Sequence, residues 1–230
     1  GLPYENPDEI VVVSSFDKQR DDDGGMSWPD YEDVSRDTKS FRGLAATADQ
    51  SFNVAGEPGT PERIIGTRVT PNTFALLGQP MLLGRDFLEG DGKPGAPEVI
   101  ILGYEVWQRR FAGDRNVIGR TVRINEKPTE IVGVMPAGVE FPSNADAWIP
   151  LQLTVDRTKR DARSLEVFGR LADRVSKREA QTELAGIGSR LEQAYPDTNR
   201  NQGIRVQTFN ERQNGGEIRV VFLMLLVAVS

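Results

Sequence analysis

Two groups of acidic residues in this sequence could bind a hard cation. The run Asp21–Asp23 stands directly before a Gly-Gly turn, and the stretch GRDFLEGDG holds a second group: Asp86, Glu89 and Asp91. Carboxylate oxygens beside a tight turn are ligands that Ca²⁺ accepts, but neither group has the alternating spacing and terminal Glu of an EF-hand loop. Both groups are therefore predicted to be solvated acidic loops, and no metal site is assigned.

Acid/base catalysis by a pair of carboxylates is the one enzymatic chemistry left open. The sequence has no His and no Cys, which excludes Ser/His/Asp and Cys/His nucleophiles and imidazole or thiolate metal sites. Its 34 acidic residues do not single out a pair, so no catalytic residue is assigned. Neither G-x-x-x-x-G-K-[ST] nor G-x-G-x-x-G is present, so no nucleotide-binding or other cofactor-binding residue is assigned either.

Aromatic and basic residues offer two further candidates. Trp107, Phe111, Phe141 and Trp148 could stack on sugars or bases, but Trp107 and Phe111 lie one helical turn apart in an amphipathic segment. We expect these aromatic side chains to be core residues. The pair Arg109-Arg110 and the cluster at residues 157–163 (RTKRDAR) are expected to be solvated, and the latter could form a hinge or a partner surface.

Composition and charge narrow the class of protein. With 230 residues, 38% of them hydrophobic, the chain is long enough to bury one large core or two small ones. A net charge of -6 argues against nucleic-acid binding, because no excess of positive charge is available to displace counterions from phosphates. Residues 220–229 (VVFLMLLVAV) are all apolar, which is typical of a buried terminal element or of the first part of a transmembrane helix.

The element pattern is similar at the two ends of the chain. Strand 10–16, a helix opening at Ser27 and strands 44–54 and 63–69 form the first group; strand 165–171, helix 176–195 and strand 204–209 form the second. Both helices begin with a capping-box pattern, Ser27 with Asp30 and Ser176 with Glu179. Two βαβ units of this kind predict an α+β fold with a ferredoxin-like subdomain.

Apolar side chains spaced three or four residues apart mark the buried face of each helix. Trp28 and Tyr31 in the first helix, and Leu184 and Leu191 in the second, are predicted to pack against the sheet.

The middle of the chain is mostly β and rich in Gly and Pro. It is predicted to hold strands at 99–102, 119–125, 129–134 and 147–151 and a short helix at 104–111. The expected organisation is a discontinuous βαβ subdomain (1–78 plus 157–213), an inserted β-rich subdomain (79–156) and a tail (214–230).

Several stretches together resemble the MacB-like periplasmic core domain, the extracytoplasmic part of FtsX-type permeases in ABC transporters. They occur in order over most of the chain: SWPDY (27–31), FRGLA (41–45), VTPNTFALLG (69–78), GRDF (84–87), VIIL (99–102), WQRRF (107–111), IGR (118–120), VGVMP (132–136) and DAWIP (146–150).

This resemblance implies that the discontinuous subdomain is porter-like and that the tail (214–230) leads into a truncated transmembrane helix. It also implies a non-catalytic extracytoplasmic (periplasmic) domain of a cell-membrane permease, which couples membrane-helix motion to export or to a partner protein. The implied partners are the flanking transmembrane helices, a separate nucleotide-binding ATPase subunit and, in exporters of the macrolide type, a periplasmic adaptor. Two alternatives stay open: a carboxylate-based hydrolase with its site between the subdomains, and a passive lipid- or peptide-binding module. The isolated domain is expected to be monomeric or only weakly associated.

Overall fold

A computed structural model describes residues 9–56, 59–139, 145–152, 158–209 and 211–212 of the chain. The chain divides into two compact units. Among the described residues, 45–159 form the first, the continuous unit, and 9–44 together with 160–212 form the second, the discontinuous unit. The chain therefore passes from one unit to the other after Leu44 and returns at Arg160.

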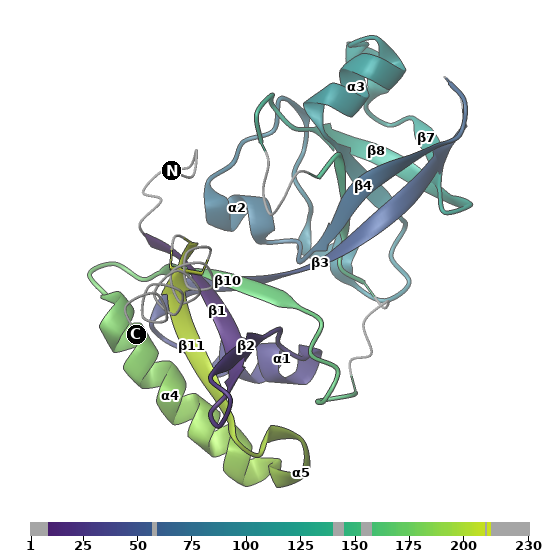
Figure 1. Ribbon diagram of the computed structural model, residues 1–230. Coiled ribbons are helices and arrows are strands. Elements are labelled where there is room, and N and C mark those ends of the chain that lie inside the picture. The colour runs from purple at the N-terminus through teal and green to yellow at the C-terminus, as the bar shows by residue number, and fades with distance from the viewer. Residues whose placement is uncertain (1–8, 57–58, 140–144, 153–157, 210, 213–230) are drawn as a thin grey trace, which may run out of the picture. The chain divides into compact units, whose positions relative to one another are not determined.

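The discontinuous unit has two βαβ arrangements whose strands interleave (Figure 1). Its strands lie in the order β11-β1-β10-β3, so β10 separates β1 from β3 and β1 separates β10 from β11. This split βαβ arrangement confirms the predicted ferredoxin-like α+β fold. Its elements are β1 (Ile10–Asp17), β2 (Asp22–Gly24), α1 (Trp28–Asp37), the start of β3 (Phe41–Ala55), β10 (Glu166–Leu171), α4 (Lys177–Ala194), α5 (Pro196–Asn199) and β11 (Gln202–Thr208).

Both long helices of this unit begin where the sequence predicts. Ser176 and Glu179 form the complete capping box at α4, with the Ser176 hydroxyl accepting from the Glu179 amide and the Glu179 carboxylate accepting from the Ser176 amide. At α1 only half of the box forms: the Ser27 hydroxyl accepts from the Asp30 amide, at 3.2 Å. The Asp30 carboxylate is engaged elsewhere.

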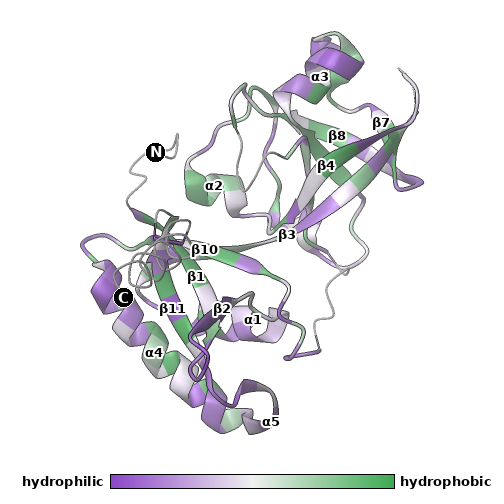
Figure 2. Cartoon of the chain, in the orientation of Figure 1, coloured by the Kyte–Doolittle hydropathy of each residue, from purple (hydrophilic) through white to green (hydrophobic). Residues whose placement is uncertain are grey.

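The predicted helical side chains are buried. Trp28, Tyr31, Leu184 and Leu191 are all at most 8% exposed. Helix α4 runs alongside β11 in Figure 1, and Figure 2 shows hydrophobic and hydrophilic residues mixed along its length, as expected for a helix with one buried face.

The continuous unit is built on a closed ring of strands. Pairings run β3-β4-β9-β6-β8, and β7 pairs with both β8 and β3, which closes the ring. A core cluster that includes Phe52, Ile100, Val106 and Trp107 is buried in this unit. Its elements after β3 are β4 (Glu62–Val69), α2 (Thr73–Leu77), β5 (Leu83–Gly84), η2 (Glu89–Gly92), β6 (Val99–Leu102), α3 (Tyr104–Phe111), η3 (Arg115–Val117), β7 (Thr121–Ile124), β8 (Lys127–Val134) and β9 (Ala147–Pro150).

The two compact units differ from the division expected from the sequence at residues 45–78. The sequence assigns these residues to the porter-like part, whereas the compact unit groups them with the middle of the chain. The reason is strand pairing: β4 is hydrogen-bonded to β9 in parallel, and the end of β3 pairs with β7.

Two further features were not expected. Residues 22–24, predicted as part of a polar loop, form strand β2 against β1, and residues 73–77 form helix α2. None of the helices in the described part of the chain is long and apolar enough to span a membrane. The apolar run 220–229 and its predicted transmembrane helix lie outside the described residues.

Candidate functional site

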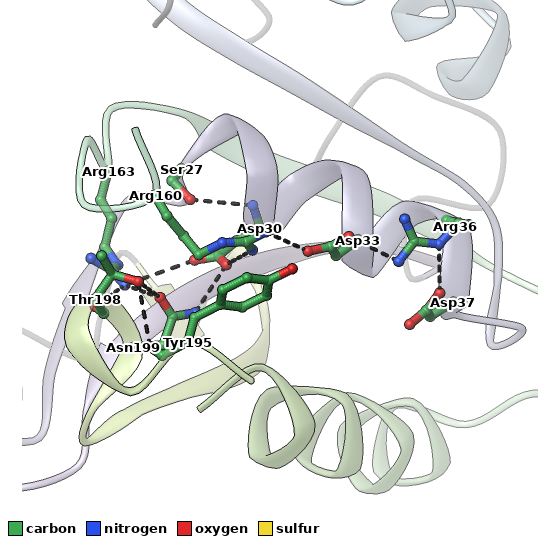
Figure 3. Close-up of polar contacts among 10 residues, drawn as sticks. All are labelled: Ser27, Asp30, Asp33, Arg36, Asp37, Arg160, Arg163, Tyr195, Thr198 and Asn199. Carbon is green, nitrogen blue, oxygen red and sulfur yellow. Dashed lines mark hydrogen bonds and ion pairs between the residues drawn. The ribbon is translucent and has the colours of Figure 1, made fainter. Parts of the chain in front are cut away.

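A buried cluster of charged and polar side chains lies at the N-terminal end of α1 in the discontinuous unit (Figure 3). We define the Asp30 cluster as Asp30, Asp33, Arg160, Arg163 and Asn199. The Asp30 carboxylate accepts from Arg160 Nη1 at 2.6 Å and from Asn199 Nδ2 at 2.9 Å. Arg160 Nη2 lies 2.8 Å from Asp33 Oδ2, so one guanidinium bridges two carboxylates of the same helix.

The second arginine of the cluster reaches α5. Arg163 Nη2 donates to the Thr198 carbonyl at 2.9 Å and to Asn199 Oδ1 at 3.2 Å, and it lies 3.8 Å from Asp30 Oδ2. The two aspartates and two arginines therefore balance in charge, and Asn199 connects Asp30 to Arg163.

The cluster is well shielded from water. The side chains of Asp30 and Arg160 are 5% and 13% exposed, so their attraction is only weakly screened by salt. Arg160 also stacks on Tyr195, with its guanidinium carbon 3.6 Å from the ring centroid. Burial alone would lower the pKa of Arg160, but hydrogen bonds to Asp30 and Asp33 outweigh burial and raise it, so the guanidinium stays charged.

Backbone contacts hold the same two segments together. Met26 and Leu165 exchange amide-to-carbonyl hydrogen bonds of 2.8 and 3.0 Å in an isolated antiparallel bridge. The approach is close at Gly25, where an added Cβ would lie 2.7 Å from the Arg163 carbonyl oxygen. A glycine is required there because any side chain would separate the segments.

The other end of α1 is tied to α4. Both carboxylate oxygens of Glu183 accept hydrogen bonds: Oε2 from the Thr38 hydroxyl at 2.7 Å and the Ser40 amide at 3.0 Å, and Oε1 from the Lys39 amide at 2.9 Å. Burial alone would raise the pKa of Glu183, but these hydrogen bonds lower it. The first helix is thus fixed by charged groups at both ends.

The first acidic run is neutralised by an arginine. Arg205 on β11 donates to Asp23 Oδ1 at 2.8 Å and also to Asp21, while its guanidinium carbon lies 4.2 Å from the Phe16 ring centroid. A bound cation would have to displace this guanidinium. Among the described residues, no group of three or more acidic side chains could hold a metal ion.

The second acidic group is divided between different roles. The Asp91 carboxylate accepts from Arg85 Nη1 at 2.7 Å and from the Leu88 amide at 2.8 Å, which stabilises the 3₁₀ turn of η2. Asp86 accepts from the Phe87 amide at 2.6 Å, and burial raises its pKa from 3.8 to about 6. This shift moves the pKa of Asp86 toward the range of a general acid.

The aromatic candidates are core residues, as predicted. Trp148 is fully buried with its ring edge-on to Phe74, and Trp107 donates from Nε1 to the Asp114 carbonyl at 2.9 Å. Phe111 is 4% exposed and belongs to the same core cluster as Trp107. Phe141 lies outside the described residues.

The basic candidates behave differently from one another. Arg110 donates to the carbonyls of Gly56 and Thr60 at 2.7 and 2.8 Å, and Arg109 pairs with Glu62 at 3.3 Å. In the cluster 157–163, Arg160 and Arg163 turn into the discontinuous unit, so the expectation of solvated side chains is wrong for these two. Arg157 lies outside the described residues.

The Asp30 cluster is not visible in the sequence because its carboxylates and arginines are far apart along the chain. The local signal is the position of Asp30. It stands at N3 of α1, where a capping-box residue is expected, but its carboxylate forms ion pairs instead. Beside the cluster, a small cavity lined by Ser15, Asp30, Leu191 and Asn199 has room for about one water molecule.

These features define a class of protein: an α+β domain with a split βαβ unit, into whose sequence a β-ring unit is inserted, and with buried ion pairs among the described residues. The family model of the MacB-like periplasmic core domain matches residues 3–187, and the chain belongs to this family. It is thus a periplasmic-type domain of MacB/FtsX-like ABC transporter permeases. No match is found among curated proteins.

Solved structures share the fold at low sequence identity. A domain of a putative permease protein from Porphyromonas gingivalis matches with a TM-score of 0.69 and 15% identity over 90% of this chain and 93% of that chain. The periplasmic region of MacB from Actinobacillus actinomycetemcomitans gives 0.63 and 15% over 91% and 95%. The extracellular domain of YknZ, a noncanonic ABC-type transporter from Gram-positive bacteria, gives 0.60 and 13% over 86% and 99%.

Proposed function

We propose that this domain is the non-catalytic, extracytoplasmic coupling part of an ABC transporter permease. It passes movement between the transmembrane helices of the same polypeptide and an exported substrate or a partner protein. The observation that carries the proposal is the family match over residues 3–187. The implied partners are the flanking transmembrane helices, a separate ATPase subunit and a periplasmic adaptor protein.

The packing of each unit supports this role. Close-packed interiors have low compressibility and transmit displacement. The continuous unit has a closed ring of strands around a buried apolar core, and the discontinuous unit has helices tied to one another by Glu183 and by the Asp30 cluster. Under the proposed function, this packing within each unit limits how much of an applied displacement is absorbed.

Cell-surface labelling tests the location. Because this sequence contains no cysteine, Arg178→Cys on the exposed side of α4 adds one defined thiol to the domain. In cells that express the whole encoded protein, a membrane-impermeant maleimide should label the variant without permeabilisation. Labelling only after permeabilisation would place the domain in the cytoplasm and refute the proposal.

Hydrogen exchange within the intact transporter tests the coupling role without knowledge of the substrate. Exchange in residues 9–212 should differ between the nucleotide-free and ATP-bound transporter, because movement of the membrane helices would reach this domain. An identical exchange pattern in a transporter that hydrolyses ATP would contradict coupling. Co-purification of the ATPase subunit with the permease provides the partner control.

The hydrolase alternative has one specific observation in its favour, the raised pKa of Asp86. Under the proposed function, the purified chain shows no turnover of ester, glycoside or peptide substrates. A turnover that is lost in Asp86→Asn, and retained in the matched variant Asp91→Asn, would favour the enzyme. A passive lipid-binding role would need more room than the water-sized cavity beside Asp30 provides.

A further inference from the structure

Helix α1 contacts both points at which the chain passes between the two units. On the outgoing side, the Tyr31 hydroxyl donates to the carbonyl of Leu44, the last residue of the discontinuous unit before the chain leaves it, at 3.2 Å. On the returning side, Asp30 and Asp33 hold Arg160, the first residue after the return, at 2.6 and 2.8 Å. Consecutive residues of one helix turn therefore hold the two crossings.

We propose that α1 is a clamp on both crossings, with Tyr31 holding the outgoing strand and the Asp30–Arg160–Asp33 bridge holding the returning segment. The clamp is itself fixed, since Glu183 of α4 ties the C-terminal end of α1 and Asn199 of α5 supports Asp30 from a second side. Both ends of α1 are thus held by other elements of the same unit.

The two arms of the clamp differ in chemistry. The outgoing arm includes a neutral hydrogen bond from a buried tyrosine, whose ring centroid lies 5.4 Å from that of Trp28. The returning arm is a buried bridge of one guanidinium between two carboxylates, and the Met26–Leu165 backbone pair reinforces it. Removing one partner of a buried ion pair leaves an uncompensated charge, so the returning arm should be the stronger one.

This inference deepens the proposed function. Only the purpose of the clamp rests on that function; the contacts that form the clamp do not. A domain that passes on movement needs its connections held, so that displacement is transmitted instead of being absorbed at the crossings. The clamp can be tested on the isolated 230-residue chain, and that test does not depend on whether the proposed function is correct.

Amide hydrogen exchange on the 230-residue chain tests the clamp. Asp30→Asn keeps the size of the side chain and removes its charge. It should speed exchange in peptides covering residues 160–166 by at least about tenfold, while peptides from the centre of α4 change by less than about twofold, because local opening is separate from global unfolding. The matched control is Asp37→Asn, a charge removal on the same helix at an exposed pair with Arg36.

The outgoing arm has its own variant. Tyr31→Phe removes only the hydroxyl and should speed exchange at residues 43–47 without affecting residues 160–166. Its control is Tyr104→Phe, another loss of a tyrosine hydroxyl on a partly buried ring. Arg160→Lys keeps the positive charge but lacks the planar fork whose two terminal nitrogens each contact one carboxylate, and it should give an intermediate effect at residues 160–166.

The outcomes separate the hypotheses. Unchanged exchange at both crossings, or equal acceleration throughout β1, β10 and α4, would overturn the clamp, because Asp30 and Tyr31 would then contribute to general stability only. If Asp30→Asn fails to fold, Tyr31→Phe and Arg160→Lys still decide the question. Failure of cell-surface labelling with a positive exchange result would refute the location and leave the clamp standing.

Discussion

Gly66 of β4 should not tolerate even one added methyl group. An ideal Cβ at this position would lie 1.9 Å from Phe52 Cε2 and 2.1 Å from Cδ2, where ordinary contacts are 3.4–4 Å. Phe52 is fully buried in the core of the continuous unit, so its ring has no open space to enter. To accept Gly66→Ala, the ring or the strand would have to move by about 1.5 Å within a close-packed interior.

The expected cost of Gly66→Ala is about 1–3 kcal/mol of the free energy of unfolding, the range for overpacked cores. Urea unfolding followed by tryptophan fluorescence measures it, in a Trp28→Phe background so that only Trp107 and Trp148 of the continuous unit report. The midpoint should fall while the m-value stays constant.

Gly186 provides the matched control for the same substitution. It lies in α4, where the nearest atom to an added Cβ is Arg190 Nη1 at 3.9 Å. Gly186→Ala should therefore stabilise the chain by about 0.5–1 kcal/mol, because Ala has the higher helix propensity. Followed by circular dichroism, the two alanine substitutions should shift the midpoint in opposite directions.

A double variant tests the cause. Phe52→Leu removes ring atoms next to Gly66, so Gly66→Ala should cost less in the Phe52→Leu background than alone, by an interaction energy of about 0.5–3 kcal/mol. Additive effects, or a Gly66→Ala chain as stable as the original, would refute the steric argument.

Three other outcomes are expected. Leu184→Ala should cost about 2–5 kcal/mol in chemical unfolding, because this side chain is fully buried between α4 and the sheet; a loss below about 0.5 kcal/mol would contradict its packing. Burial raises the pKa of Asp86 from 3.8 to about 6, so the folded chain binds more protons than the unfolded chain within that window, and stability should fall as the pH rises through it. Asp86→Asn should remove this contribution and raise the midpoint at pH 7; a steeper pH dependence in the variant would refute the assignment. The isolated chain should sediment as a monomer at micromolar concentration, and a tight dimer would contradict that expectation.

Local sequence patterns predict the elements of this fold well where the signal lies within one element. The helix predicted at residues 104–111 is α3 with the same bounds, and the capping box of Ser176 and Glu179 forms in full. Both depend on side chains within a few residues of one another. Helix periodicity and helix-capping patterns can be recognised within such short stretches of sequence.

Features that depend on distant residues could not be predicted in the same way. The sequence predicts an acidic loop at β2, because it does not show that Arg205, near the other end of the chain, pairs with Asp21 and Asp23. The sequence likewise predicts that Arg160 and Arg163 are solvated. In the fold they contact Asp30 and Asn199, which are distant in sequence. A surface charge and one half of a buried ion pair are the same residue type in sequence, and only tertiary contacts distinguish them.

The discontinuous unit has a consequence for the order in which the chain folds. Ile10 of β1 pairs with Arg170, and Val11 with Thr208, so β1 cannot acquire its sheet neighbours other than the short strand β2 until nearly all of the described chain is available. Residues 45–159 have no such dependence and can complete their ring of strands first. During synthesis, which proceeds from the N-terminus, the apolar residues 10–14 (IVVVS), which β2 does not cover, therefore stay unpaired until β10 and β11 are made. This segment is where aggregation or the action of a holding chaperone would begin.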